Sequence, residues 1–88
     1  MAHDFEYDEI KNKKNINKHG MDFITIQALW NDPDRVEIPA RTEDEPRNLI
    51  IGRIENTVWS VVITYRGNKT RIISARRSRE KEIIIYES

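Results

Sequence analysis

Positively charged side chains gather between Thr64 and Glu82, where they could hold the phosphates of a nucleic acid. This stretch, TYRGNKTRIISARRSREKE, contains seven arginine and lysine residues, although the whole chain of 88 residues has no formal net charge. Arginine stays charged and binds phosphate oxygens in pairs. We therefore expect an anion to bind Arg66 and Arg71, with Arg76 arriving from the end of a strand and Thr64 donating a hydroxyl.

Four further side chains are candidates for binding the same ligand: Arg47, Lys69, Arg77 and Tyr86. Arg47, Arg77 and Tyr86 each have a plainer alternative. Arg47 could pair locally with Glu45, and Tyr86 could lie at the edge of the core instead of giving a proton or stacking on a base. The arginines at 76, 77 and 79 could instead pair with Glu80, with Glu82 or with an acidic partner.

Cleavage of RNA without a metal ion needs a base for the 2′-hydroxyl, an acid for the leaving 5′-oxygen and cations for the phosphate. His19 titrates near neutral pH and is a candidate for proton transfer, with Lys18 beside it. Both residues also fit the last turn of a helix, where the helix dipole favours cations. Position alone therefore does not assign them to a site.

We expect neither a metal ion nor another cofactor. Two histidines far apart and no cysteine leave no zinc-binding cluster, and the three isolated glycines form no phosphate-binding loop. The absence of cysteine fits a reducing compartment. The N-terminus has acidic residues where a signal peptide would be basic, and no apolar run approaches about 20 residues. We therefore expect a cytoplasmic protein.

Charge is distributed unevenly between the two halves of the chain. Residues 1–46 contain six lysine and arginine residues against eleven acidic ones, whereas residues 47–88 contain nine against four. Such a division fits a surface that binds nucleic acid, and it fits two solvated surfaces that attract each other equally well. Charge alone therefore leaves two classes of function open, a nuclease and a non-catalytic binding module or corepressor.

Local patterns predict a single α+β domain over residues 1–88, with two N-terminal helices packed on one face of a sheet. The polar helix Glu9–His19 should begin after Asp8 and end at Gly20. Its apolar stripe is thin and depends on two residues: Ile10 and Ile16. The helix should therefore lie on the surface. The next segment, FITIQALWN, follows a second candidate cap, Asp22, and should be a helix that faces the core.

The other segments predict a small antiparallel sheet. The expected strands are, in chain order, DFEY, RVEIPA, NLIIGRI, VWSVVITY and TRIISAR. A polar loop, RTEDEPR, should join the second strand to the third. The final segment, SREKEIIIYE, fits either a helix or a strand, and we choose a short helix capped by Ser78.

A two-residue turn at Gly67–Asn68 would set the register of the last hairpin. Gly67 suits the first position of a type II′ turn. Three cross-strand pairs follow from this turn: Arg66 with Lys69, Thr64 with Arg71, and Val62 with Ile73. Alternation of side chains then places the basic residues on one face. The opposite face should form the core through five residues: Trp59, Val61, Ile63, Tyr65 and Ile72.

An ordered series of short motifs resembles the BrnT toxins of bacterial type II toxin–antitoxin systems. The series is FEYDE, NKHG followed by DF, NDP, EPR, IG, TYRG, RIISAR and a final YE, and it extends from Phe5 to Glu87. RIISAR is its most specific part. Two positions depart from the family pattern. Tyr7 stands where the family usually has tryptophan, and the ARTEDEPR loop has no histidine.

The resemblance implies a compact fold like that of the RelE ribonucleases and a toxin that cleaves RNA and arrests growth. It implies neutralisation by an antitoxin resembling BrnA, whose DNA-binding part is of the ribbon-helix-helix type, in a complex with two copies of each protein. Operator DNA would be bound mainly through the antitoxin. The KHG motif also raises Lys18 and His19 as residues of the catalytic site or of the antitoxin interface.

Overall fold

The computed structural model describes residues 4–40 and 45–88, so His3 and residues 41–44 of the predicted polar loop lie outside it. The strands are β1 (Phe5–Tyr7), β2 (Val36–Ala40), β3 (Arg47–Ile54), β4 (Thr57–Arg66) and β5 (Lys69–Arg77). The helices are α1 (Glu9–His19), the 3₁₀ helix η1 (Thr25–Asn31) and α2 (Glu80–Glu87). The α+β class is confirmed, and none of these helices has the length and apolar character needed to cross a membrane.

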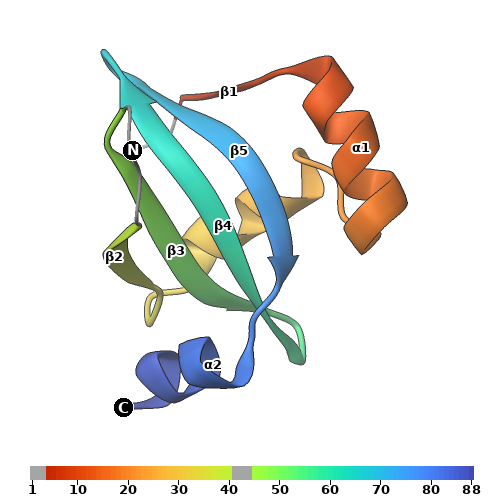
Figure 1. The fold of residues 1–88 in the computed structure, drawn as a ribbon. Coiled ribbons are helices and arrows are strands. Elements are labelled where there is room, and N and C mark those ends of the chain that lie inside the picture. Colours follow the sequence, from red (N-terminus) through yellow and green to blue (C-terminus); the bar gives the residue numbers. More distant parts are fainter. Residues whose placement is uncertain (1–3, 41–44) are drawn as a thin grey trace.

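All five strands form one sheet in the order β1-β5-β4-β3-β2 (Figure 1). The prediction of a purely antiparallel sheet is wrong, because β1 runs parallel to β5. The backbone N–H of Thr70 donates to the carbonyl of Asp4 over 2.7 Å, which ties this short strand to the outer edge of β5. The sheet is therefore mixed, with an edge strand that comes from the other end of the chain.

The main core lies between one face of the sheet and the segment around η1, which crosses behind β3, β4 and β5 in Figure 1. Phe23, Ile26, Leu29 and Trp30 are buried, as predicted for a core-facing helix. The helix is a 3₁₀ helix, however, and it begins only at Thr25. Residues three apart are aligned in 3₁₀ geometry, so positions 26 and 29 of the helix point to the core together.

Asp22 explains why the helix starts late. Its carboxylate accepts hydrogen bonds from the backbone N–H groups of Ile24 and Thr25 and from the hydroxyl of Thr25. These bonds hold a tight turn before the helix, as side-chain oxygens do at helix starts. The prediction of Asp22 as the N-cap is therefore wrong, because Ile24 is the N-cap residue and Asp22 holds the turn before it.

Helix α1 has the predicted ends but packs differently from the prediction. Asp8 accepts from the N–H of Ile10, and Gly20 has a left-handed φ of 70°. The expected apolar stripe is not the packing face, because Ile10 and Ile16 are 65% and 42% exposed. The one buried side chain of α1 is instead polar: Asn15. The helix is therefore on the surface, as expected, and it is anchored by an amide.

Asn15 joins α1 to β5. Its Nδ2 donates to the carbonyl oxygens of Met21 and Ala75, over 2.9 and 2.8 Å, and its Oδ1 accepts from the N–H of Ala75 over 3.0 Å. The side-chain amide thus takes the place of a neighbouring strand beyond the end of β1. Every polar atom of this buried amide has a partner, as burial requires.

A β-bulge corrects the predicted register of the last hairpin. Gly67 has a positive φ of 59°, as expected for the turn, and the two pairs nearest the turn are confirmed. The third pair is wrong, because Val62 faces Ser74. Ile73 is the extra residue, since Ile72 still faces Ile63. The bulge turns Arg76 to the same face of the sheet as Arg71, which alternation over five residues would forbid.

The last segment is a helix, as chosen, but Ser78 does not cap it. Arg79 is the N-cap residue, and its N–H donates to the carboxylate of Glu82 over 2.8 Å. The hydroxyl of Ser78 instead lies 2.7 Å from that of Ser60 on β4. No residue of α2 is fully buried, so polar contacts must contribute much of its attachment to the sheet.

Gly52 on β3 is the point where the sheet comes closest to η1. A Cβ at this position would lie 2.7 Å from Cδ2 and 2.9 Å from Cγ of Leu29, which is fully buried. We expect Gly52→Ala to lower the free energy of unfolding by about 1–3 kcal/mol through overpacking. Chemical denaturation measures this change, and an unchanged midpoint would show that Leu29 can move aside.

Candidate functional site

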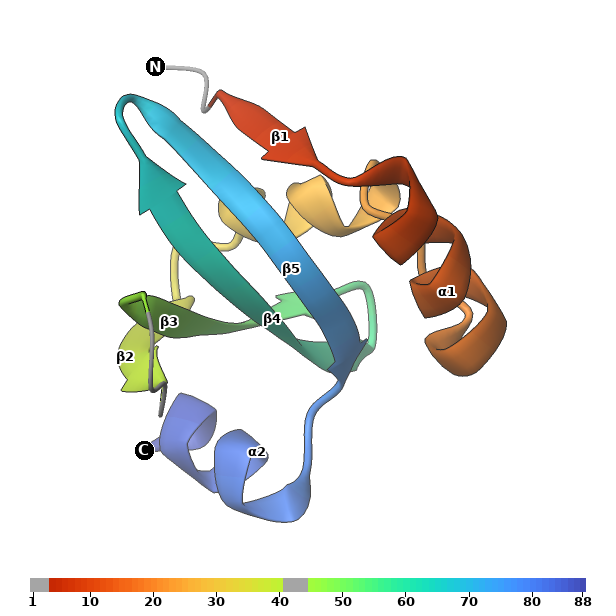
Figure 2. The same ribbon diagram turned by 45° about the horizontal axis from the view of Figure 1, so that its top comes forward.

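A shallow groove between α1 and β5 gathers much of the basic charge. It has a volume of about 560 Å³, and the two elements lie side by side in Figures 1 and 2. We call this feature the basic groove. Its walls are formed by Lys11, Lys14, Asn15, Lys18, His19, Ile73, Ser74, Arg76 and Arg79.

Local structure explains why these residues meet. Positions 11, 14, 15 and 18 are three or four residues apart, so they share one face of α1. The amide of Asn15 fixes that face against β5, and the bulge at Ile73 turns Ser74 and Arg76 toward it. The groove thus has five lysine and arginine side chains, one histidine and no acidic residue in its walls.

His19 has a pKa below its ordinary value of 6.5. Desolvation by partial burial is the largest cause, and the positive charges of Lys18 and Arg76 add to it. The imidazole is therefore neutral at neutral pH, the form that can accept a proton. The structure brings together three of the predicted catalytic residues, Lys18, His19 and Arg76, in one groove.

The pKa of His19 gives a test of this arrangement. A reaction that uses the neutral imidazole should become faster as pH rises through a value below 6.5. Lys18→Gln removes a neighbouring positive charge, so we expect the midpoint of this acidic limb to move to higher pH, whatever the maximal rate. The measurement is kcat/KM for RNA cleavage between about pH 4.5 and 8. A midpoint that stays in place would exclude coupling between the two residues.

Arg76 is held in place by Glu82 of α2. Its two terminal nitrogens donate to the two carboxylate oxygens, each over 2.7 Å. The hydroxyl of Ser60 also donates to Glu82, over 2.9 Å. The hydrogen bonds from Arg76 are the main cause that lowers the pKa of Glu82 to about 2. The same bonds to Glu82 are the main cause that raises the pKa of Arg76. The predicted alternative of an Arg76–Glu82 ion pair is thus confirmed.

The remaining predicted catalytic residues lie toward the other end of the hairpin. Arg71 and Arg76 face Thr64 and Ser60, which are four residues apart on β4, and this corresponds to about 13 Å. Arg71 forms a 2.7 Å ion pair with Glu6 of β1, and Arg66 lies 3.8 Å from Glu45. The predicted residues therefore fall into two sets, and Arg66 and Arg71 of the second set pair with acidic residues.

Three predicted residues of this second set have particular surroundings. Thr64 is buried, and its hydroxyl donates to the carbonyl of Pro46 over 2.8 Å. Arg47 lies 4.0 Å from Glu45, which confirms the local ion pair weighed for it. Lys69 is exposed and faces Arg66 across the turn. Thr64 is thus occupied by a backbone contact, whereas Lys69 is open to solvent.

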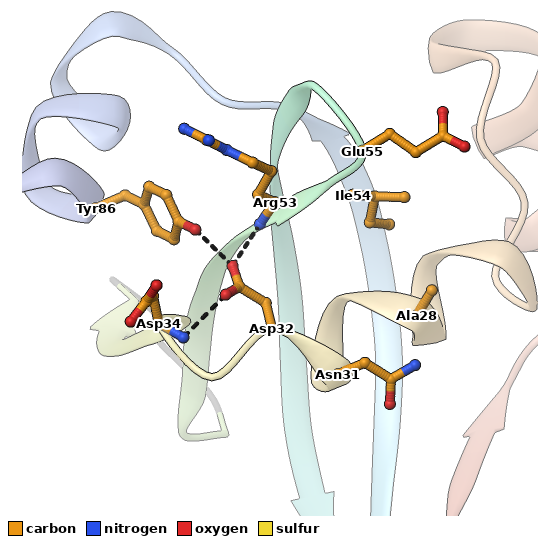
Figure 3. Close-up of a pocket in the computed structure, with 8 residues that line it drawn as sticks. All are labelled: Ala28, Asn31, Asp32, Asp34, Arg53, Ile54, Glu55 and Tyr86. Carbon is orange, nitrogen blue, oxygen red and sulfur yellow. Dashed lines mark hydrogen bonds between the residues drawn. The ribbon is translucent and has the colours of Figure 1, made fainter.

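Arg77 and Tyr86 lie apart from both sets. Arg77 is exposed and, because it pairs with Trp59, it is on the core side of the sheet. Tyr86 is in a separate pocket of about 410 Å³ (Figure 3). Its hydroxyl donates a hydrogen bond to Asp32 over 2.6 Å, and this bond is the main cause that raises the pKa of Tyr86 to about 12. The Arg53 guanidinium lies 5.7 Å from the centre of the Tyr86 ring.

The acidic residues of that pocket distinguish it from the basic groove. Asp32, Asp34 and Glu55 line it, and the carboxylate of Asp32 also accepts from the backbone N–H groups of Arg53 and Asp34 (Figure 3). Across the described ranges, no group of three histidine, cysteine, aspartate or glutamate side chains is placed to hold a metal ion. The hydrogen bond between Tyr86 and Asp32 thus joins α2 to the C-terminal end of η1.

Two cations of the groove, Lys11 and Lys14, were not predicted from the sequence, and Arg79 was considered only for an ion pair. The helical spacing of the lysines at 11, 14 and 18 is the sequence feature that indicates this surface. It shows a basic helix face, but it does not show that β5 lies opposite that face.

Comparison with known families defines the class of protein. Residues 7–82 match the model of the family described as the ribonuclease toxin BrnT of type II toxin–antitoxin systems. The chain belongs to this family, because the match covers most of its 88 residues. A search of curated proteins gave no match. The predicted family is thus confirmed, and membership implies a toxin, a ribonuclease activity, an RNA substrate and an antitoxin partner.

Proposed function

We propose that this protein is a metal-independent endoribonuclease toxin and that its reaction takes place in the basic groove. The observation that supports this is the grouping of His19, with its lowered pKa, beside Lys18 and Arg76. Neutral His19 takes the proton of the 2′-hydroxyl, which then attacks the adjacent phosphorus. Arg76 and Lys18 stabilise the negative charge on the phosphoryl oxygens. The Lys18 ammonium gives a proton to the leaving 5′-oxygen.

The hairpin residues Thr64, Arg66 and Arg71 have a supporting role in this proposal. Arg71 lies about 13 Å from Arg76 along the sheet, and it would bind a different phosphate of the same RNA. Lys69, Arg47, Arg77 and Tyr86 stay predicted RNA-binding residues. The wider assembly also belongs to the proposal: a single RelE-like toxin domain in the cytoplasm, with a BrnA-like ribbon-helix-helix antitoxin in a two-plus-two complex that binds operator DNA mainly through the antitoxin.

The proposed role of the hairpin arginines can be tested by growth arrest. We expect Arg66→Ala and Arg71→Ala to abolish toxicity while leaving the fold intact. The ion pair of Arg71 with Glu6 supplies a matched control, because Glu6→Gln breaks the same pair and keeps the cation. If Glu6→Gln arrests growth and Arg71→Ala does not, the result supports a role of Arg71 in RNA binding. Arrest by both arginine variants at the wild-type level would remove these residues from the site.

Independence from metal ions has a direct assay. Purified protein should shorten RNA at an undiminished rate in excess EDTA, and His19→Ala should lower the rate by about 100-fold or more. A pure binding module needs only the cations of the groove, so in that case RNA would stay intact and His19→Ala would bind it as wild type does. Loss of cleavage on adding EDTA would contradict the metal-independent mechanism.

A further inference from the structure

The basic groove extends past the residues that the proposed chemistry uses. Lys18, His19 and Arg76 suffice for one phosphate, yet Lys11 and Lys14 continue the same wall of α1 toward its N-terminus. Both lysines are exposed, and within residues 4–40 and 45–88 neither forms an ion pair. Two unpaired cations on one helix face beside a catalytic group indicate further negative charge in the ligand.

The length of this wall fits a strand of nucleic acid. Residues 11 to 18 span about 10 Å of helix. One strand of a duplex has a charge about every 3.4 Å, and an extended single strand has wider spacing, so the wall matches about two or three successive phosphates. The groove volume of about 560 Å³ lies within the usual range for ligand sites and can hold part of a single strand.

The composition of the groove indicates which part of the strand it contacts. Its walls contain no phenylalanine, tyrosine or tryptophan on which a base could stack, and their one imidazole, that of His19, lies at the catalytic end. Ile73 is the only large apolar residue among them. Lysine contacts to phosphate position a nucleic acid without reading its sequence. Binding along α1 should therefore be independent of sequence.

We propose that Lys11 and Lys14 bind the phosphates next to the scissile one and guide single-stranded RNA along α1 into the catalytic part of the groove. The proposal rests on the proposed ribonuclease function, which places the scissile phosphate beside His19. It assigns both lysines to the RNA backbone, and it separates them from Lys13, which is on the same helix but outside the groove.

The test compares two double variants with equal loss of charge. One is Lys11→Gln/Lys14→Gln, and the control is Lys13→Gln/Lys81→Gln, whose lysines are exposed and lie outside the groove. The probe is a short 2′-O-methyl RNA, which can be bound but not cut by 2′-hydroxyl attack. Fluorescence anisotropy at several salt concentrations gives the slope of log affinity against log salt.

We expect the groove variant to reduce the steepness of this slope by about 1.4, because each phosphate contact with a single strand contributes about 0.7. Two probes of unrelated sequence should lose affinity by the same factor, and the control should behave as wild type. An unchanged slope, an equal loss in the control or a loss on one sequence only would overturn the proposal. So would a groove variant that loses antitoxin binding alone, because an acidic antitoxin segment would then be the ligand.

The same variants separate this proposal from the ribonuclease function on which it rests. If the groove variant shows the expected slope change but wild type does not cut unmodified RNA, the phosphate contacts stand and the catalytic proposal fails. If wild type cuts RNA and the slopes are equal, the ribonuclease stands and the proposed path along α1 is wrong.

Discussion

Replacing Arg76 with alanine should stop RNA cleavage and lower the free energy of unfolding by about 3 kcal/mol at neutral pH. The substitution removes a groove cation and leaves the carboxylate of Glu82, whose side chain is only 13% exposed, without its opposite charge. Breaking one side of such a pair is costly because the other charge stays out of water. Chemical denaturation and an RNA cleavage assay measure the two effects separately.

The pH dependence of stability provides a second measure of this pair. The pKa of Glu82 falls from 4.5 to about 2 on folding, so its carboxylate stabilises the folded state fully above about pH 5. This contribution is lost as pH falls through about 2, and it amounts to about 3 kcal/mol. We expect Glu82→Gln to be less stable at pH 7 and to lose less stability than wild type between pH 5 and 2.

Arg77→Ala is the matched control for Arg76→Ala. Arg77 is the next residue on β5, it is exposed, and it points to the opposite side of the sheet. Its removal should change stability by less than about 0.5 kcal/mol. If Arg76→Ala is as stable as Arg77→Ala, the bond with Glu82 does not stabilise the fold. If Arg76→Ala cuts RNA at the wild-type rate, Arg76 has no part in catalysis.

Asn15→Asp should destabilise the protein by about 3–5 kcal/mol, although it keeps the shape of the side chain. Asn15 donates two hydrogen bonds, to the carbonyl oxygens of Met21 and Ala75. A carboxylate would turn an oxygen toward both carbonyls and place a negative charge in a buried site. Loss of this contact should also release α1 from β5 and abolish the groove.

Asn17→Asp gives the same change of chemistry on an exposed position of α1. Thermal unfolding compares the two variants, and a loss of 3 kcal/mol corresponds to a fall in Tm of more than about 10 °C for a domain of this size. Equal melting temperatures for Asn15→Asp and Asn17→Asp would show that the amide does not join α1 to β5.

Features that depend on neighbouring residues were predictable from the sequence. The limits of α1 follow from Asp8 and Gly20, and the last turn follows from Gly67, because these residues act on their own backbone. The buried positions of η1 also followed from spacing. Its 3₁₀ form did not, since Asp22 can hold a tight turn or begin an α-helix.

Features that depend on distant segments were not predictable. The bulge at Ile73 and the parallel pairing of β1 are set by the strands opposite them. Asn15 gave no signal, because a polar residue in a polar helix is ordinarily exposed. For the same reason Lys18, His19 and Arg76 were each predicted, but their meeting in one groove, away from Arg66 and Arg71, required the structure.

Mapping new RNA 5′ ends in cells after induced expression is the most direct test of whether this toxin cuts RNA in the basic groove. Wild type, Lys13→Gln and His19→Ala should be compared at equal amounts of folded protein, with ribosomes and native RNA available. We expect new ends with wild type and Lys13→Gln and none with His19→Ala. The absence of new ends with soluble, folded wild type would contradict the ribonuclease, and equal ends with His19→Ala would contradict the assigned site.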